Sequence, residues 1–181
     1  MSSRDRSVAL LIFPHQLFDD HPGLRLSPDH VFIIEDSLFF GDPLHPTRFH
    51  KQKLWLHRAS MTRYHNRLKK DGVSVEYIEY QQGSSPLKKL FQGQLKGTAD
   101  LLMVADVHDD LLRRRLERFC ASGGIDLEWL GTPMFLNSSE TNAEYREGKK
   151  RWFMADFYKF QRRRLDILME DKSPEGGEWS F

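Results

Sequence analysis

Short, mostly apolar runs are the feature that most constrains the fold of this chain. Three of them, residues 7–13, 30–35 and 99–105, are six or seven residues long, and each is followed by a proline or an acidic residue. A run of this length that is apolar on both faces is typical of a strand buried on both sides. Such strands occur in parallel sheets covered by helices. The runs therefore predict an α/β domain.

The remaining segments complete a regular alternation of strands and helices. Two runs in which apolar and polar residues alternate, 73–80 and 125–130, predict two further strands. Apolar residues at three- and four-residue spacing predict helices over 49–70, 87–95, 106–121 and 152–169. This order predicts a flavodoxin-like or Rossmann-like doubly wound fold, with a mainly parallel five-stranded sheet and helices on both faces.

The character of the sequence changes after Pro133. A polar stretch with helix-capping residues follows, then the last predicted helix and a tail rich in turn-forming residues. The length of 181 residues suits one domain with a short appendage. We expect an α/β domain over 1–135 and a connecting helical segment over 136–181. The tail ends on aromatic residues, and we expect a further domain to follow.

Charge argues against a domain that holds nucleic acid through phosphates. The chain has 27 Lys and Arg against 26 Asp and Glu, a net charge of +1, whereas such domains usually carry a clear basic excess. Two arginine clusters stand out, Arg113 to Arg118 and Arg162 to Arg164. Each is either a phosphate-binding strip or a solvated helix face, and the second interpretation is favoured.

Several classes of site lack their usual signals. The single cysteine, Cys120, excludes a disulfide within the chain, and the spacing of His15, His45 and His50 matches no metal-ligand pattern. The glycine-rich phosphate-binding patterns and the G-x-S-x-G pattern are missing. No run reaches 18 apolar residues, so we expect a soluble, cytoplasmic protein with no membrane association.

Polar residues that follow the predicted strands are the candidate site, because ligands of open α/β sheets bind beyond the carboxyl ends of strands. His15 and Gln16 follow the first strand, and Glu35 ends the second. The start of the helix at 49–70 carries His50 with two lysines, which suits an anionic or polar ligand. His57 lies on the same helix face. The alternative is that these residues are helix caps and core side chains.

Several sequence blocks, spread over nearly the whole chain, carry a resemblance to a known family. They are Phe49-His-Lys-Gln-Lys-Leu54, Arg58-Ala-Ser-Met61, 68–72, 75–77, Pro133-Met-Phe-Leu136, Phe157-Tyr-Lys-Phe-Gln-Arg-Arg-Arg164, 168–169, Pro174 and Gly176-Gly-Glu-Trp-Ser-Phe181. In these blocks the chain resembles the N-terminal domain of the photolyase-related proteins, the bacterial iron–sulfur cryptochromes and photolyases.

The resemblance implies an antenna domain that binds a lumazine-type chromophore at the carboxyl edge of its sheet. Carried over by position, the chromophore-binding residues are Phe13, His15, Gln16, Glu35, His50, Leu54 and His57. In the family, a C-terminal helical domain holds FAD, an iron–sulfur cluster and the DNA site. This domain is the implied partner, and DNA is contacted only through it. No catalytic or metal-binding residue is assigned here, and the fragment alone is not expected to be an enzyme.

Two departures from the family pattern leave alternatives open. His15 stands where the family turn has an acidic residue, and the Phe39-Phe40 pair either stacks on a chromophore or occupies its place. One alternative is a free-standing α/β interaction or regulatory domain with an empty pocket. Another is a small-molecule enzyme that uses His15, Glu35 and His50 as an acid–base set.

Overall fold

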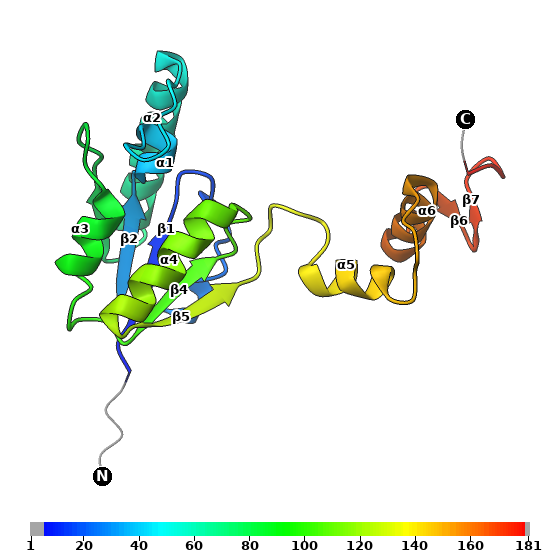
Figure 1. The fold of residues 1–181 in the computed structure, drawn as a ribbon. Helices are drawn as coiled ribbons and strands as arrows, with labels where there is room; N and C mark the ends of the chain where they lie inside the picture. Colours follow the sequence, from blue (N-terminus) through cyan, green and yellow to red (C-terminus); the bar gives the residue numbers. More distant parts are fainter. Residues whose placement is uncertain (1–5, 180–181) are drawn as a thin grey trace, which may run out of the picture. The chain divides into compact units, whose positions relative to one another are not determined.

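The computed structural model describes residues 6–179 and divides into two compact units (Figure 1). The first unit extends to Pro133, and the second begins at Met134. The first contains the sheet and the second contains short helices and a hairpin. Each unit is described by itself.

The first unit is built on a five-stranded sheet in which every pair of neighbours is parallel. Its order is β3-β2-β1-β4-β5. The chain moves outward from β1 to β3 and then crosses back to β4, so the switch point lies between β1 and β4. All five predicted strands are confirmed to within two residues at each end. They are β1 (Val8–Ile12), β2 (His30–Ile34), β3 (Val75–Ile78), β4 (Leu101–Ala105) and β5 (Asp126–Leu130).

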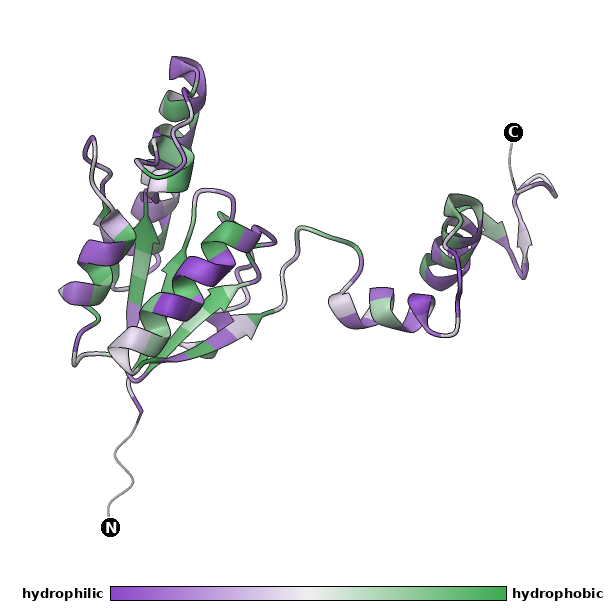
Figure 2. Ribbon diagram, viewed as in Figure 1, coloured by the Kyte–Doolittle hydropathy of each residue, from purple (hydrophilic) through white to green (hydrophobic). Residues whose placement is uncertain are grey.

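Helices cover both faces of the sheet, as the fold prediction requires. On one face, α3 (Pro86–Gln92) and α4 (Asp110–Gly123) pack their apolar residues against β1, β2 and β4. On the other face, α2 (Lys51–Lys70) buries Met61 and Leu68 against β1, β2 and β3. Figure 2 shows the strands as predominantly hydrophobic and α4 with both hydrophobic and hydrophilic residues. The central strand β1 is buried on both sides, which is why its sequence is continuously apolar.

Local rules explain where the helices differ from their predicted bounds. The predicted helix over 106–121 begins only at Asp110, because Asp109 caps it by accepting a hydrogen bond from the Leu112 amide at 2.7 Å. α3 ends before Gly93. Two short elements lie outside the predicted pattern, the 3-10 helix η1 (Leu24–Leu26) and α1 (Ser37–Phe40). They are too short to show a helical period.

The second unit consists of α5 (Ser139–Arg146), α6 (Met154–Leu165) and a small antiparallel hairpin, β6 (Met169–Glu170) with β7 (Ser173–Pro174). Tyr145 forms its centre, with ring centroids of Phe157 and Phe160 each 5.0 Å away. The helix predicted over 152–169 is shorter because Asp166 adopts a left-handed conformation at φ 54° and ends it. Across the described residues of both units, no helix is long and apolar enough to cross a membrane.

The loop before η1 approaches the sheet so closely that one glycine lacks room for a methyl group. A Cβ on Gly23 would lie 2.4 Å from Cδ1 of the fully buried Leu10. Gly23 has φ −73°, so a side chain at this position would be disfavoured by crowding and not by backbone strain.

We predict that Gly23→Ala lowers the free energy of unfolding by about 1–3 kcal/mol. The control Gly131→Ala meets no atom within 4 Å and is expected to change it by less than about 0.5 kcal/mol. Urea unfolding measures both, and equal effects would contradict this packing.

Candidate functional site

Two of the predicted ligand residues belong to the scaffold at the switch point. The Gln16 side chain is fully buried, accepts from the Phe13 amide at 3.3 Å and donates to the Ala105 carbonyl at 2.7 Å. It therefore joins the ends of β1 and β4. Phe13 itself is fully buried in the core beneath α3 and α4. Both residues lie at the predicted edge, but their described contacts are within the protein.

Glu35 is fully buried at the end of β2 and accepts hydrogen bonds from three residues. The Arg58 guanidinium donates twice, at 2.7 and 2.6 Å. The Tyr77 hydroxyl donates at 2.7 Å and the Tyr80 amide at 2.9 Å. A carboxylate has about four acceptor positions, so these bonds fill them. A ligand nitrogen that hydrogen-bonded to Glu35 would have to displace one of these donors. Burial of the Tyr77 hydroxyl, aided by its hydrogen bond to the Glu35 carboxylate, raises the pKa of Tyr77 well above its usual range.

The start of α2 places His50 and Leu54 in ordinary structural roles. His50 caps the helix, and its Nδ1 accepts from the Gln52 amide at 3.2 Å. Leu54 is half-buried against the core beneath α2. Within the described residues, no hydrogen bond joins His15, Glu35 or His50 to one another. The structure thus gives no support to an acid–base set built from these three side chains.

His15 and His57 both contact Phe39. The His15 ring stacks on Phe39 with centroids 5.1 Å apart, and His57 meets Phe39 edge-on at 6.1 Å. Phe39 comes from α1, directly beyond the end of β2. The sequence left open whether the Phe39-Phe40 pair stacks on a chromophore or occupies its place, and in this structure the Phe39 ring is in contact with both histidines.

The buried nitrogens of these histidines lack hydrogen-bond partners. Both ring nitrogens of His15 and Nε2 of His57 are buried and unpaired in the described structure. Burial lowers the pKa of His15, and the nearby backbone of Val107 opposes this shift only in part. Burial, aided by the charge of Lys53, also lowers the pKa of His57. The two rings are therefore mainly neutral at pH 7, and apart from the interaction of His15 with the Val107 backbone the protein uses little of their capacity for hydrogen bonding.

A second polar cluster, which the sequence analysis missed, lies toward α4. Asp42 is buried and accepts from the amides of Leu44 and His45, each at 2.9 Å, and from the Ser37 hydroxyl at 2.6 Å. Arg115 of α4 donates to both carboxylate oxygens and holds the pKa of Asp42 well below its usual range. Asp42 and Arg115 are 73 residues apart, so no local pattern marks them as partners.

Asp36 lies beside this cluster and behaves differently. Its Oδ1 accepts from the Leu38 amide at 2.9 Å and caps α1, whereas its buried Oδ2 has no partner in the described structure. Burial raises the pKa of Asp36 to about 6. Asp36 follows Glu35 directly in the sequence, but the sequence did not indicate that the Asp36 side chain is buried.

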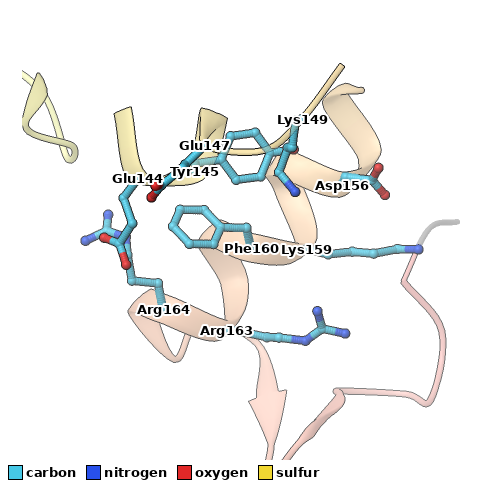
Figure 3. Close-up of a pocket in the computed structure, with 9 residues that line it drawn as sticks. All are labelled: Glu144, Tyr145, Glu147, Lys149, Asp156, Lys159, Phe160, Arg163 and Arg164. Atoms are coloured by element: carbon cyan, nitrogen blue, oxygen red, sulfur yellow. The ribbon is translucent and has the colours of Figure 1, made fainter. Parts of the chain in front are cut away.

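The second unit has an open depression of about 620 Å³ beside the Tyr145–Phe160 contact (Figure 3). Four cationic side chains line it, Lys149, Lys159, Arg163 and Arg164, and three carboxylates, Glu144, Glu147 and Asp156. The near balance of charge indicates a solvated surface and not a phosphate-binding strip. Arg162, the first residue of the arginine cluster Arg162 to Arg164, is buried and donates to the Ile167 carbonyl at 3.2 Å. No group of histidine, cysteine and acidic residues in the described part of the chain is arranged to hold a metal ion.

Comparison with known proteins gives matches over most of the chain. Residues 10–181 match the family described as deoxyribodipyrimidine photo-lyase-related protein. The chain is 32% identical to the uncharacterized protein R852 of Acanthamoeba polyphaga mimivirus, over 94% of this chain and 89% of that protein. It is 26% identical to a (6-4) photolyase of Agrobacterium fabrum (strain C58), over 73% of this chain and 27% of that protein. The matched region is thus about a quarter of the photolyase.

The ion pair between Arg58 and Glu35 is the first feature of this site that mutation can test. Arg58→Gln removes two donors from a buried carboxylate, while the half-exposed position lets water replace them in part. We predict a loss of about 1–3 kcal/mol in the free energy of unfolding. Arg63→Gln, an exposed site on the same helix, is the control and should change it by less than about 0.5 kcal/mol. Urea unfolding at pH 7 makes the comparison, and a neutral Arg58→Gln would show that the pair does not stabilise the fold.

The raised pKa of Asp36 predicts a pH dependence of stability. The folded protein binds this proton up to about pH 6, whereas the unfolded chain releases it near 3.8. Stability is therefore lost as pH rises between these values. Asp36→Asn keeps the capping oxygen and should raise the free energy of unfolding at pH 7 by up to about 3 kcal/mol, with little change at pH 4. Unfolding at both pH values tests this, with Asp109→Asn as control. An equal gain at pH 4 and pH 7 would contradict it.

Proposed function

This chain belongs to the deoxyribodipyrimidine photo-lyase-related protein family, and we propose that it is the antenna-type α/β domain of a photolyase- or cryptochrome-related flavoprotein. In this proposal it binds a lumazine-type chromophore at the carboxyl edge of the sheet and is not catalytically competent alone. The family match over residues 10–181 and the similarity to a (6-4) photolyase support the class of protein. The contacts of His15 and His57 with Phe39 support the position of the chromophore.

The observation that carries the proposal is the pair of neutral histidines with unpaired nitrogens around Phe39. Buried polar atoms in folded proteins nearly always have partners, and exceptions often mark ligand sites. Here three such nitrogen atoms belong to His15 and His57, the two histidines that contact Phe39 beyond the end of β2. A planar heteroaromatic ligand in the place of the Phe39 ring would stack on the face of His15. A polar atom of the ligand could then hydrogen-bond to Nε2 of His57, whose ring is steeply inclined to that plane.

The sequence predicted that Glu35 binds the chromophore directly. The geometry instead supports an indirect role for Glu35. Its acceptor positions are filled by Arg58, Tyr77 and Tyr80, so we propose that it positions these residues beside the ligand. Phe39 is the element that moves. It is half-buried, lies in a four-residue helix and packs at the margin of the core, so its ring can move at a smaller cost in packing than a fully buried side chain.

Chemistry on DNA rests, in this proposal, with a separate helical domain that holds FAD and an iron–sulfur cluster. The sequence contains one cysteine, and burial raises the pKa of its thiol to about 12, so these 181 residues cannot supply four thiolate ligands. Large apolar side chains are exposed in the second unit and suit burial against such a domain. They are Met134, Phe135, Leu136, Trp152, Phe153 and Met154, together with Ile167 and Leu168.

One observation favours a second function, a free-standing α/β interaction or regulatory domain. The Phe39 ring already contacts both histidines, in the place proposed for the ligand. If it stays there, the carboxyl edge is a filled relic of an antenna site. The two functions differ in one measurable property, which is whether a lumazine displaces Phe39.

Titration with 6,7-dimethyl-8-ribityllumazine, followed by its fluorescence, distinguishes the two functions. We predict saturable binding to the wild-type chain. Phe39→Ala should bind roughly fivefold more tightly, because the ring no longer has to be displaced, an effect of about 1 kcal/mol. His15→Ala should bind about tenfold more weakly, because the ligand loses its stacking partner. Phe119→Ala, a half-buried phenylalanine of α4, is the control and should leave the affinity unchanged.

One result would contradict the antenna role. If neither the wild-type chain nor Phe39→Ala binds the lumazine at high micromolar concentration, and both are folded by circular dichroism, the antenna role is excluded. The interaction domain then remains.

A further inference from the structure

The arginine cluster of α4 separates into two groups with different surroundings. Arg113 pairs with Asp106 at 2.6 Å and lies over the Trp129 ring, and Arg114 pairs with Asp110 on the exposed surface. Arg115 and Arg118, one turn apart, line a cavity instead. The sequence left open a phosphate-binding strip or a solvated helix face for the whole cluster, with the solvated face favoured; in the structure the four arginines do not share one environment.

The cavity has a volume of about 190 Å³ and lies among α3, α4 and the loop that follows α1. Lys88 of α3 faces it together with Arg115 and Arg118, and the hydroxyl-bearing Ser85 lies at the same wall. Leu44 and Phe119 make its apolar side. The cavity thus combines cations with an apolar wall.

The charge inside this cavity is uncompensated. Asp42 is its one carboxylate, and Arg115 already neutralises it. Five hydrogen bonds to Asp42 leave it no free acceptor position for another cation. Lys88 and Arg118 form no ion pair with any residue that the structure describes, so the cavity carries a net charge of about +2.

We propose that this cavity binds the phosphate group of a small phosphomonoester. A phosphomonoester dianion matches the two unpaired cations, and Arg118 offers the planar, paired donors that suit phosphate oxygens. The Ser85 hydroxyl can donate a further hydrogen bond. The volume is below the range of sites that enclose a drug-sized molecule. It therefore fits the phosphate and a few carbon atoms of its ester group, which pack on Leu44 and Phe119.

The cavity is distinct from the proposed chromophore site, although α1 contributes Ser37 to the first and Phe39 to the second. The cavity is on the side of the sheet covered by α3 and α4, where Phe119 packs against the core. His57 and Arg58 belong to α2, which covers the other face. Binding at the two sites can therefore be tested with variants on different helices.

Isothermal titration with inorganic phosphate and with phenyl phosphate, at constant ionic strength, tests the proposal. We expect saturable binding of both, with phenyl phosphate tighter because its ring packs on the apolar wall. Lys88→Gln and Arg118→Gln should each weaken binding at least tenfold. The matched controls are Lys89→Gln, a neighbour on α3, and Arg114→Gln on α4. All four side chains are exposed, but the two control residues do not line the cavity, so their variants should stay within twofold of wild type.

Each other outcome overturns the proposal. Binding that does not saturate, or equal losses in the control variants, would mean general attraction of anions to a basic surface. Unchanged affinity in a folded Lys88→Gln, Arg118→Gln double variant would place the phosphate elsewhere. Inorganic phosphate that binds as tightly as phenyl phosphate would exclude a phosphomonoester as the ligand. Circular dichroism of every variant separates lost binding from lost folding.

Discussion

The buried carboxylate of Glu35 is the interaction on which the carboxyl edge of this sheet depends. An ionised group removed from water is strongly destabilising unless charges and hydrogen bonds compensate it. Here Arg58 reaches it from α2, and Tyr77 and Tyr80 reach it from the end of β3 and the loop beyond. The charge thus fixes how α2 and β3 lie relative to β2. The remaining features of the edge are built around that arrangement.

The edge has two sides with different chemistry. Toward α2, two neutral histidines and Phe39 form an aromatic group with unused hydrogen-bonding capacity. Toward α4, the Asp42–Arg115 pair is fully hydrogen-bonded and borders a cavity of uncompensated positive charge. α1 lies between the two sides, since it contributes Phe39 to the first and Ser37 to the second. One chain segment beyond β2 therefore shapes both.

The strands could be predicted because burial on both faces is a local property of sequence, and β1 shows it most clearly. The site was harder, because its partners are set by tertiary contacts. Gln16 lies at the predicted edge, but that its amide bonds to Ala105 across the sheet depends on which strand lies next to β1. Arg58 was visible only as part of a family block, and nothing in the sequence linked it to Glu35, 23 residues earlier. The contact of Phe39 with both histidines likewise depends on the three-dimensional path of a short loop.

His15 and His57 form a half-buried, mainly neutral pair in contact with the Phe39 ring. Long-range proton–nitrogen NMR spectra of the wild-type chain, recorded as a function of pH, measure the ionisation of each imidazole directly. Nuclear Overhauser effects report the contacts of each ring. The account predicts that both histidines titrate below the ordinary value near 6.5, in the direction that their burial dictates, and that both rings show Overhauser effects to Phe39. Histidines that titrate at or above 6.5, without contacts to Phe39, would contradict it.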